Sequence, residues 1–104
     1  MANPNRGEVE LKAGEETYTL VFDINAVCEL EQMLDKGVNE IVVQMGRVSV
    51  LRAMLWAGLR HNHKVTIEQA GEIMQMAGAA ETAAMIQKAT ELAFPPKDST
   101  KNPQ

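Results

Sequence analysis

The chain has 104 residues and a formal net charge of −4, and hydrophobic residues make up 45% of it. This length has room for one domain with a modest core, and a single cysteine excludes an intramolecular disulfide, which favours a reducing, cytoplasmic location. No apolar run approaches the ~20 residues of a membrane span, and the first residues lack the apolar segment of a signal peptide.

Two runs of alternating residues predict a hairpin near the N-terminus. Residues 1–7 are polar and contain proline and glycine, so we expect a frayed end. Apolar and polar side chains then alternate in residues 8–12 and again in 17–22, with a turn at Ala13-Gly14 between the two runs. We therefore expect a β-hairpin over residues 8–22, with one apolar face that needs to be covered, because an isolated hairpin is barely stable in water.

The segment over residues 49–60 is predicted to be the central helix. Apolar side chains cover well over half of its circumference, whereas a surface helix needs an apolar stripe of only ~100°. We therefore expect other elements, the hairpin among them, to cover this helix from more than one side. Leu51, Leu55 and Leu59 should be among the most buried residues of the chain, and Ser49 should cap the helix.

Helical periodicity predicts four further helices. They cover residues 24–36, 38–45, 67–77 and 80–93. The second also fits a strand because it is rich in β-branched residues, but we predict a short helix there. The expected fold class is α+β and mostly α, with a two-stranded β-hairpin packed on a bundle of four to five short helices. A single folded domain should span residues 8–96, and the polar residues 97–104 should be disordered.

Local end signals support two of these helices in particular. Asp23 or Asn25 can cap the first, and Gly37 is expected to end it. Thr66 and Gln69 stand at the spacing of a capping box, which predicts a start of the fourth helix of the chain at residue 67.

The sequence contains no arrangement of residues that predicts catalysis or metal binding. His61 and His63 flank an asparagine, but this tripeptide is not the dispersed motif of the nucleases that share its letters. Two histidines fall short of the three or four ligands of a stable metal site, and Cys28 lies on the acidic side of its helix, which disfavours the reactive thiolate. We therefore expect a protein that is not an enzyme and has no cofactor or metal.

The basic residues gather in one segment and include a candidate binding surface. Residues 47–64 hold four basic side chains, both histidines and no acidic residue. One interpretation is a basic patch that binds nucleic acid or an acidic partner. The other, which we favour, is that these residues form ion pairs with the acidic helices of the chain itself. Within this segment Arg52, Trp56 and Arg60 stand four residues apart, so they share one helix face. Trp and Arg are enriched in interface hot spots, so we predict partner binding here; the alternative is that the indole ring packs on a neighbouring element.

Five segments, in a fixed order between about residues 5 and 96, carry a resemblance to a known family. They read NRGEVEL, LVFDINAVCELEQML, VLRAMLWAGLRH, VTIEQAGEIM and ELAFPP. Their most specific parts are Asn25-Ala26 followed by residues 29–31, then residues 55–60, then Thr66 with Ala70-Gly71, although a branched aliphatic residue often replaces Ala70 in this family. On these segments the chain resembles the small gene-transfer-agent and phage tail family, whose members are read as tail assembly chaperones or labelled tail tube proteins.

The resemblance implies a function that no single residue carries. It implies a non-enzymatic, cytoplasmic protein of phage or prophage tail morphogenesis, which coats apolar helical segments of the tape measure protein while tail tube protein subunits assemble. The implied partners are therefore the tape measure protein and the tail tube protein, with self-association as a further option. One alternative is a structural tail component. Another is a small helical DNA-binding regulator, which we do not favour because the basic segment is expected to be too buried for a recognition helix.

Overall fold

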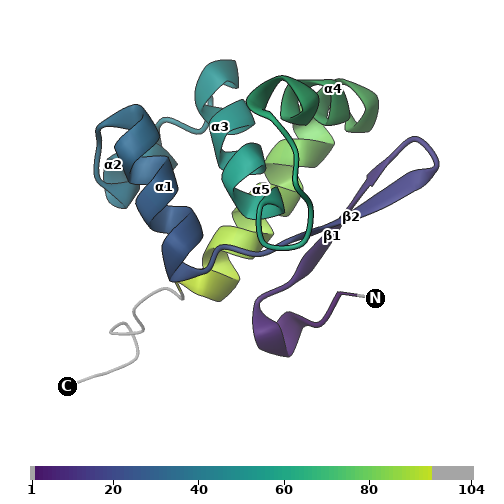
Figure 1. Ribbon diagram of the computed structural model, residues 1–104, viewed down its shortest axis with the longest axis horizontal. Helices are drawn as coiled ribbons and strands as arrows, with labels where there is room; N and C mark the ends of the chain where they lie inside the picture. The colour runs from purple at the N-terminus through teal and green to yellow at the C-terminus, as the bar shows by residue number, and fades with distance from the viewer. Residues whose placement is uncertain (1, 95–104) are drawn as a thin grey trace.

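The computed structural model describes residues 2–94 as a hairpin followed by helices (Figure 1). In chain order the elements are η1 (Pro4–Arg6), β1 (Val9–Ala13), β2 (Glu16–Leu20), α1 (Ile24–Leu34), α2 (Val38–Val43), α3 (Val48–Leu59), α4 (Ile67–Ala77) and α5 (Ala79–Ala93). The expected α+β, mostly α fold is confirmed. The expected end of the domain at residue 96 and the prediction for residues 97–104 lie outside the described residues.

The hairpin forms where the alternation predicts it. β1 and β2 pair antiparallel, with Ala13 opposite Glu16, so that a two-residue turn joins them. Gly14 opens this turn with φ +66°, a conformation that glycine adopts without a steric penalty. The residues that alternate along one face, Val9, Leu11 and Ala13, are all buried. The paired strands are shorter than the expected range of 8–22, because the chain leaves the ladder after Leu20.

The N-terminal segment, where we expected fraying, forms a single 3-10 turn in the structure. The side chain of Asn3 accepts a hydrogen bond from the backbone N–H of Asn5, and Pro4 occupies the first position of the turn. Two carboxylates of the following segment also hold it, since Glu10 accepts from the N–H of Ala2 at 3.3 Å and Glu8 accepts from the N–H of Asn3 at 2.8 Å. The turn is therefore tied to the start of β1.

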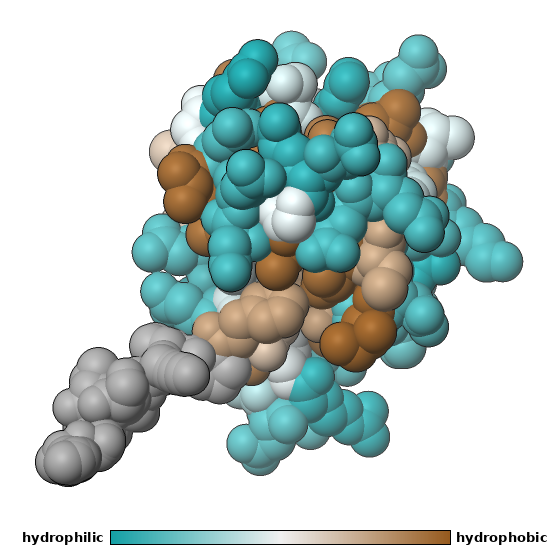
Figure 2. All heavy atoms as spheres, turned by 90° about the vertical axis from the view of Figure 1, so that its left-hand side faces the viewer, coloured by the Kyte–Doolittle hydropathy of each residue, from teal (hydrophilic) through white to brown (hydrophobic). Residues whose placement is uncertain are grey.

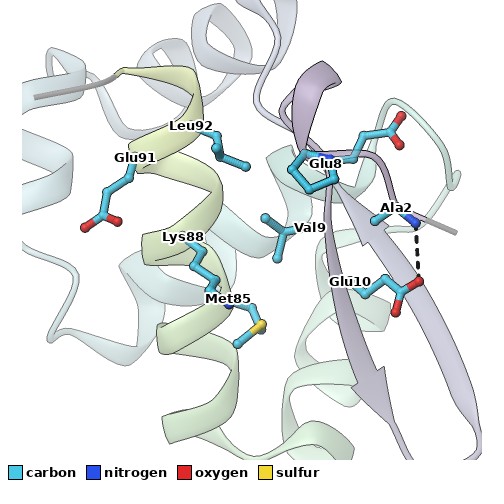
Figure 3. A pocket seen from close by; sticks show the side chains of 9 residues that line it. Ala2, Glu8, Val9, Glu10, Met85, Lys88, Glu91 and Leu92 are labelled. Carbon is cyan, nitrogen blue, oxygen red and sulfur yellow. Dashed lines mark hydrogen bonds between the residues drawn. The ribbon is translucent and has the colours of Figure 1, made fainter.

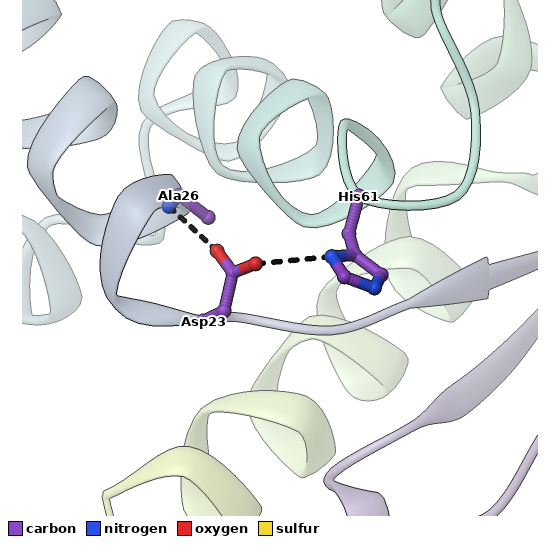
Figure 4. A network of polar contacts seen from close by, with 3 residues as sticks. All are labelled: Asp23, Ala26 and His61. Atoms are coloured by element: carbon purple, nitrogen blue, oxygen red, sulfur yellow. Dashed lines mark hydrogen bonds and ion pairs between the residues drawn. The ribbon is translucent and has the colours of Figure 1, made fainter.

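Helix α1 begins at its predicted cap and ends earlier than expected. Asp23 Oδ1 accepts a hydrogen bond of 2.8 Å from the N–H of Ala26 (Figure 4). The predicted end at Gly37 is wrong, because Asp35 takes the left-handed conformation with φ 54° and stops the helix at Leu34. Asp is among the few residues that tolerate this conformation, so Gly37 is left to precede α2 instead.

Helix α3 is the central element, as predicted. Eight of its twelve residues are buried, and the exposed fractions of Leu51, Leu55 and Leu59 are 4%, 0% and 0%. The prediction that Ser49 caps it is wrong: the helix starts at Val48, and the residue before it makes no side-chain cap. Ala53 is also buried, although it lies next to Arg52 in the chain.

The hairpin covers α3 chiefly with one of its strands. β2 packs on α3, whereas the main contacts of β1 are with α4 and α5, so the expectation that the hairpin covers the central helix holds chiefly for β2. Gly58 is the closest point, because its carbonyl oxygen accepts a 2.9 Å hydrogen bond from the N–H of Val21. A β-carbon at Gly58 would lie 3.3 Å from the Phe22 ring, so the strand end can approach here because the residue is glycine.

The last two helices start at local signals. α4 has the predicted capping box: Thr66 Oγ1 accepts from the N–H of Gln69 at 3.0 Å, and the Gln69 side chain accepts from the N–H of Thr66 at 2.8 Å. Gly78, with φ +94°, separates α4 from α5. In Figure 1, α5 passes behind α3 and α4 and reaches the side of the hairpin. None of the described helices is long and apolar enough to span a membrane.

Candidate partner-binding site

The structure places the three predicted binding residues on the part of α3 that the core leaves open. Arg52, Trp56 and Arg60 are all half-buried, while their neighbours on the other faces of the helix are buried. Their spacing of four residues aligns them along one face. Their role in partner binding stays a prediction.

Trp56 is not a freely exposed side chain. Its indole N–H donates a hydrogen bond of 3.1 Å to the carbonyl oxygen of Val65, in the segment that leads into α4. The ring also packs against the buried core. The ring therefore lies on a neighbouring element, as the alternative interpretation has it, and a partner can contact only the part that remains open.

A hollow lies beside the C-terminal half of this face. Its wall includes Trp56, Arg60, His63 and Lys64, and its volume is about 390 Å³. His63 Nε2 accepts a 3.0 Å hydrogen bond from the N–H of Thr19, so the neutral ring carries its proton on Nδ1. Burial lowers the pKa of His63 from its ordinary value of 6.5, so the positive charge at neutral pH comes from Arg60 and Lys64.

A second hollow lies beside the N-terminal half of the same face. It is formed by Val48 and Arg52 of α3 together with Glu68, Gly71 and neighbouring residues of α4. The Arg52 side chain lies across Gly71, because a β-carbon there would be 3.1 Å from its Cδ. Val48 is 62% exposed and adds apolar surface. The two hollows thus follow one another along the boundary between α3 and α4.

The expected ion pairs between the basic segment and the acidic helices are absent from the part of the chain that the structure describes. The ion pair found among residues 2–94 joins His61 Nδ1 to Asp23 Oδ2 at 3.1 Å (Figure 4). Within residues 2–94, Arg52, Arg60 and Lys64 form none, so the interpretation that we favoured is wrong for them. We call the surface formed by Val48, Arg52, Trp56, Arg60 and Lys64 the α3–α4 seam. It combines apolar area with basic side chains that form no ion pair within residues 2–94, and Glu68 and Glu72 also line the hollow beside Arg52.

The His61–Asp23 pair is the polar contact that sequence reasoning missed. The two residues are 38 positions apart, and the pair forms because the loop after α3 meets the start of α1. Asp23 uses its other oxygen to cap α1. Within residues 2–94 no nucleophile hydrogen-bonds the imidazole, and no group of three metal-ligating side chains gathers there or elsewhere. The pair therefore joins the loop after α3 to the start of α1.

The face formed by α1 and α2 offers no second site of comparable character. Figure 2 shows that polar side chains cover most of it, with apolar ones between them, chiefly in the lower half. The most exposed large apolar residues of these two helices are Ile24 and Val43, at 72% and 83%. Scattered apolar residues of this kind are normal on a protein surface.

Comparison with protein families identifies a match. A family model described as "Phage tail tube protein, GTA-gp10" matches residues 6–94. This range includes both strands, all five helices and every residue of the α3–α4 seam. No curated protein and no solved structure matches the chain.

Proposed function

The chain belongs to the gene-transfer-agent and phage tail family, and from this premise we propose that it is a non-enzymatic tail assembly chaperone. Its client is an apolar helical segment of the tape measure protein, which it covers until tail tube subunits assemble around it. We place the client on the α3–α4 seam. The observation that carries this choice is the combination, on one helix face, of half-buried Trp56 with basic side chains that form no ion pair within residues 2–94.

The dimensions of the seam fit a helical client. α3 has twelve residues, and at 1.5 Å per residue such a helix is about 18 Å long. A client helix of about three turns can lie along it, with its apolar residues on Val48 and the open part of Trp56. Acidic residues beside the client's apolar stripe would meet Arg52 and Arg60. This is helix-in-groove recognition, in which a few anchor side chains supply most of the binding energy.

Co-expression with fragments of the tape measure protein tests the proposal. The chain should hold at least one apolar helical fragment in soluble form and should be recovered with it on an affinity resin. Arg52→Glu combined with Arg60→Glu should weaken binding at least about tenfold, which corresponds to about 1.4 kcal/mol. Trp56→Ala should weaken binding by about 2 kcal/mol.

Two controls separate loss of binding from loss of fold. Lys36→Glu changes an exposed charge beyond the end of α1 and should leave binding unchanged. Trp56→Ala also removes the hydrogen bond to Val65 and some packing, so the thermal midpoint of each variant is measured first. Unchanged binding by the folded double arginine variant would remove the client from the seam, and failure to retain any fragment would reject the chaperone function.

The same family description favours a structural role as the second candidate. It names a tail tube protein, and a tube subunit has to associate with copies of itself. Sedimentation and electron microscopy of the purified chain, over a range of concentrations, distinguish the two functions. Rings or tubes formed without any tape measure fragment would support the structural subunit, whereas a chaperone should remain in small species until its client is added.

The salt dependence of DNA binding distinguishes the chaperone from a DNA-binding regulator. The few basic residues of the seam can neutralise few phosphates, so duplex DNA should bind weakly and dissociate at moderate salt. Duplex DNA added to the pull-down should therefore not displace a bound fragment. Binding of DNA that persists at high salt would favour the regulator.

A further inference from the structure

The two outer edges of the hairpin differ in how their backbone groups are used. On the outer edge of β2, the N–H of Thr19 donates to His63 Nε2 at 3.0 Å and the N–H of Val21 donates to the carbonyl oxygen of Gly58 at 2.9 Å. Helix α3 and the loop after it therefore block a further strand at the C-terminal end of this edge.

The outer edge of β1 is open. In an antiparallel ladder, residues directly opposite each other either bond to one another or both face outward. Thr19 faces outward, so its partner Glu10 does as well, and Lys12 follows two residues later. No hydrogen bond within residues 2–94 takes up the outward N–H of either residue. The free edge stops at Glu8, whose N–H donates to the carbonyl oxygen of Asn3.

This free edge borders a groove between β1 and α5. The groove has a volume of about 560 Å³, and Figure 3 shows Val9 of β1 facing Met85 and Leu92 of α5 across it. Leu92 is 41% exposed. The groove thus has apolar walls beside backbone groups that can pair with another chain.

The charged side chains around the groove are mostly acidic. Glu8, Glu10 and Glu91 line it against a single basic residue, Lys88. Antiparallel pairing with a second copy of β1 sets two Glu10 side chains opposite each other when it is centred on Glu10, but sets Glu10 opposite Lys12 when it is centred on Leu11. The test therefore has to separate a second copy from another occupant. Glu8 and Glu10 each accept one backbone N–H, from Asn3 and from Ala2, but neither pairs with a basic side chain within residues 2–94. An occupant with positive charge therefore complements the groove.

We propose that the outer edge of β1 binds, by strand addition, an extended protein segment in which basic and apolar side chains alternate. Glu10 and Lys12 each offer one N–H and one C=O for the added strand. Because side chains alternate between the two faces of a strand, every second residue of the segment lies on the face of Glu8 and Glu10. The residues between them enter the groove and contact Val9, Met85 and Leu92. This surface is separate from the α3–α4 seam, so the inference stands apart from the proposed chaperone function.

Amide hydrogen exchange tests the proposal with a defined probe. The probe is a synthetic peptide of alternating lysine and valine, about six residues long with blocked ends, which matches the length of a typical strand. At saturating peptide the amides of Glu10 and Lys12 should exchange at least about tenfold more slowly. A peptide of alternating glutamate and valine should bind at least about tenfold more weakly, as judged by titration of the same amides.

Matched variants and a modified probe show whether backbone pairing is responsible. Glu10→Pro removes an outward N–H without removing a ladder bond and should abolish protection at Lys12, whereas Glu10→Gln keeps the backbone group and should retain most of the binding. A lysine–valine peptide with alternate N-methyl groups provides the same test on the unaltered protein and should not bind.

Three results would overturn the proposal. The first is equal binding of the N-methylated peptide, because strand addition needs the backbone donors. The second is a response confined to residues outside β1 and α5. The third is protection of Glu10 and Lys12 that rises with protein concentration in the absence of peptide, because it would make a second copy the occupant.

Discussion

Helices α3 and α4 pack against each other and have almost the same length, yet different features specify them. α3 has twelve residues, of which eight are buried, and its N-terminus has no side-chain cap. α4 has eleven residues, of which three are buried, and it starts with a complete capping box. The pair shows that a helix can be stabilised mainly by the burial of its side chains or by a cap at its N-terminus. Substitutions at these two kinds of position should therefore have unequal effects.

The largest effect is expected in the interior of α3. Leu55 is 0% exposed, so Leu55→Ala should lower the free energy of unfolding by about 2–5 kcal/mol, from lost burial and from the cavity left behind. Denaturant titration measures this loss. Val43→Ala is the control, because Val43 is 83% exposed and its truncation should change stability by less than about 0.5 kcal/mol. A loss below about 1 kcal/mol for Leu55→Ala would contradict its central place in the core.

A smaller effect is expected at the start of α4. Thr66→Ala removes the side-chain oxygen that accepts from the N–H of Gln69 and should cost about 1 kcal/mol. Ser49→Ala is the matched substitution at the start of α3, where the serine makes no cap, and it should change stability by less than about 0.5 kcal/mol. Equal losses from the two substitutions, measured by the same titration, would remove the distinction between the two helices.

The smallest effect is a pH dependence in the loop that joins the two helices. Burial lowers the pKa of His63 in the folded state from 6.5. Above pH 6.5 the ring is neutral in both the folded and the unfolded chain, so its protonation does not reduce the free energy of unfolding. As the pH falls through 6.5 toward the lower folded pKa, the unfolded chain binds more protons and the free energy of unfolding decreases. Protonation also removes the acceptor that Nε2 offers to the N–H of Thr19.

Histidine substitutions identify the source of that pH dependence. Unfolding is measured between about pH 7.5 and pH 5.5, above the range in which most carboxylates titrate. His63→Gln should remove the part of the decrease that belongs to this ring, whereas His61→Gln, which changes the exposed partner of Asp23, should keep it. An unchanged slope in His63→Gln would show that another group is responsible.

The sequence-based errors have two physical origins. Gly37 can end a helix and Ser49 can cap one, but neither does so here. Asp35 stops α1 before Gly37 is reached, and α3 begins one residue before Ser49. At Trp56, helical periodicity gives the face of a side chain but not what covers that face. The first error concerns competition between neighbouring residues, and the second concerns contacts between distant elements.

By itself, the sequence determined the hairpin, the five helices, the capping box of α4 and the burial of Leu55, because alternation, helical period and capping act within a few residues. Only the tertiary structure decided that α3 and the loop after it bind the C-terminal end of the outer edge of β2, while the outer edge of β1 stays free beside α5 within residues 2–94. It also decided that the Trp56 indole bonds to Val65 and that the basic residues of the seam stay unpaired within residues 2–94. These features depend on how whole elements pack. A local sequence pattern does not indicate which distant element will contact a given helix face or strand edge.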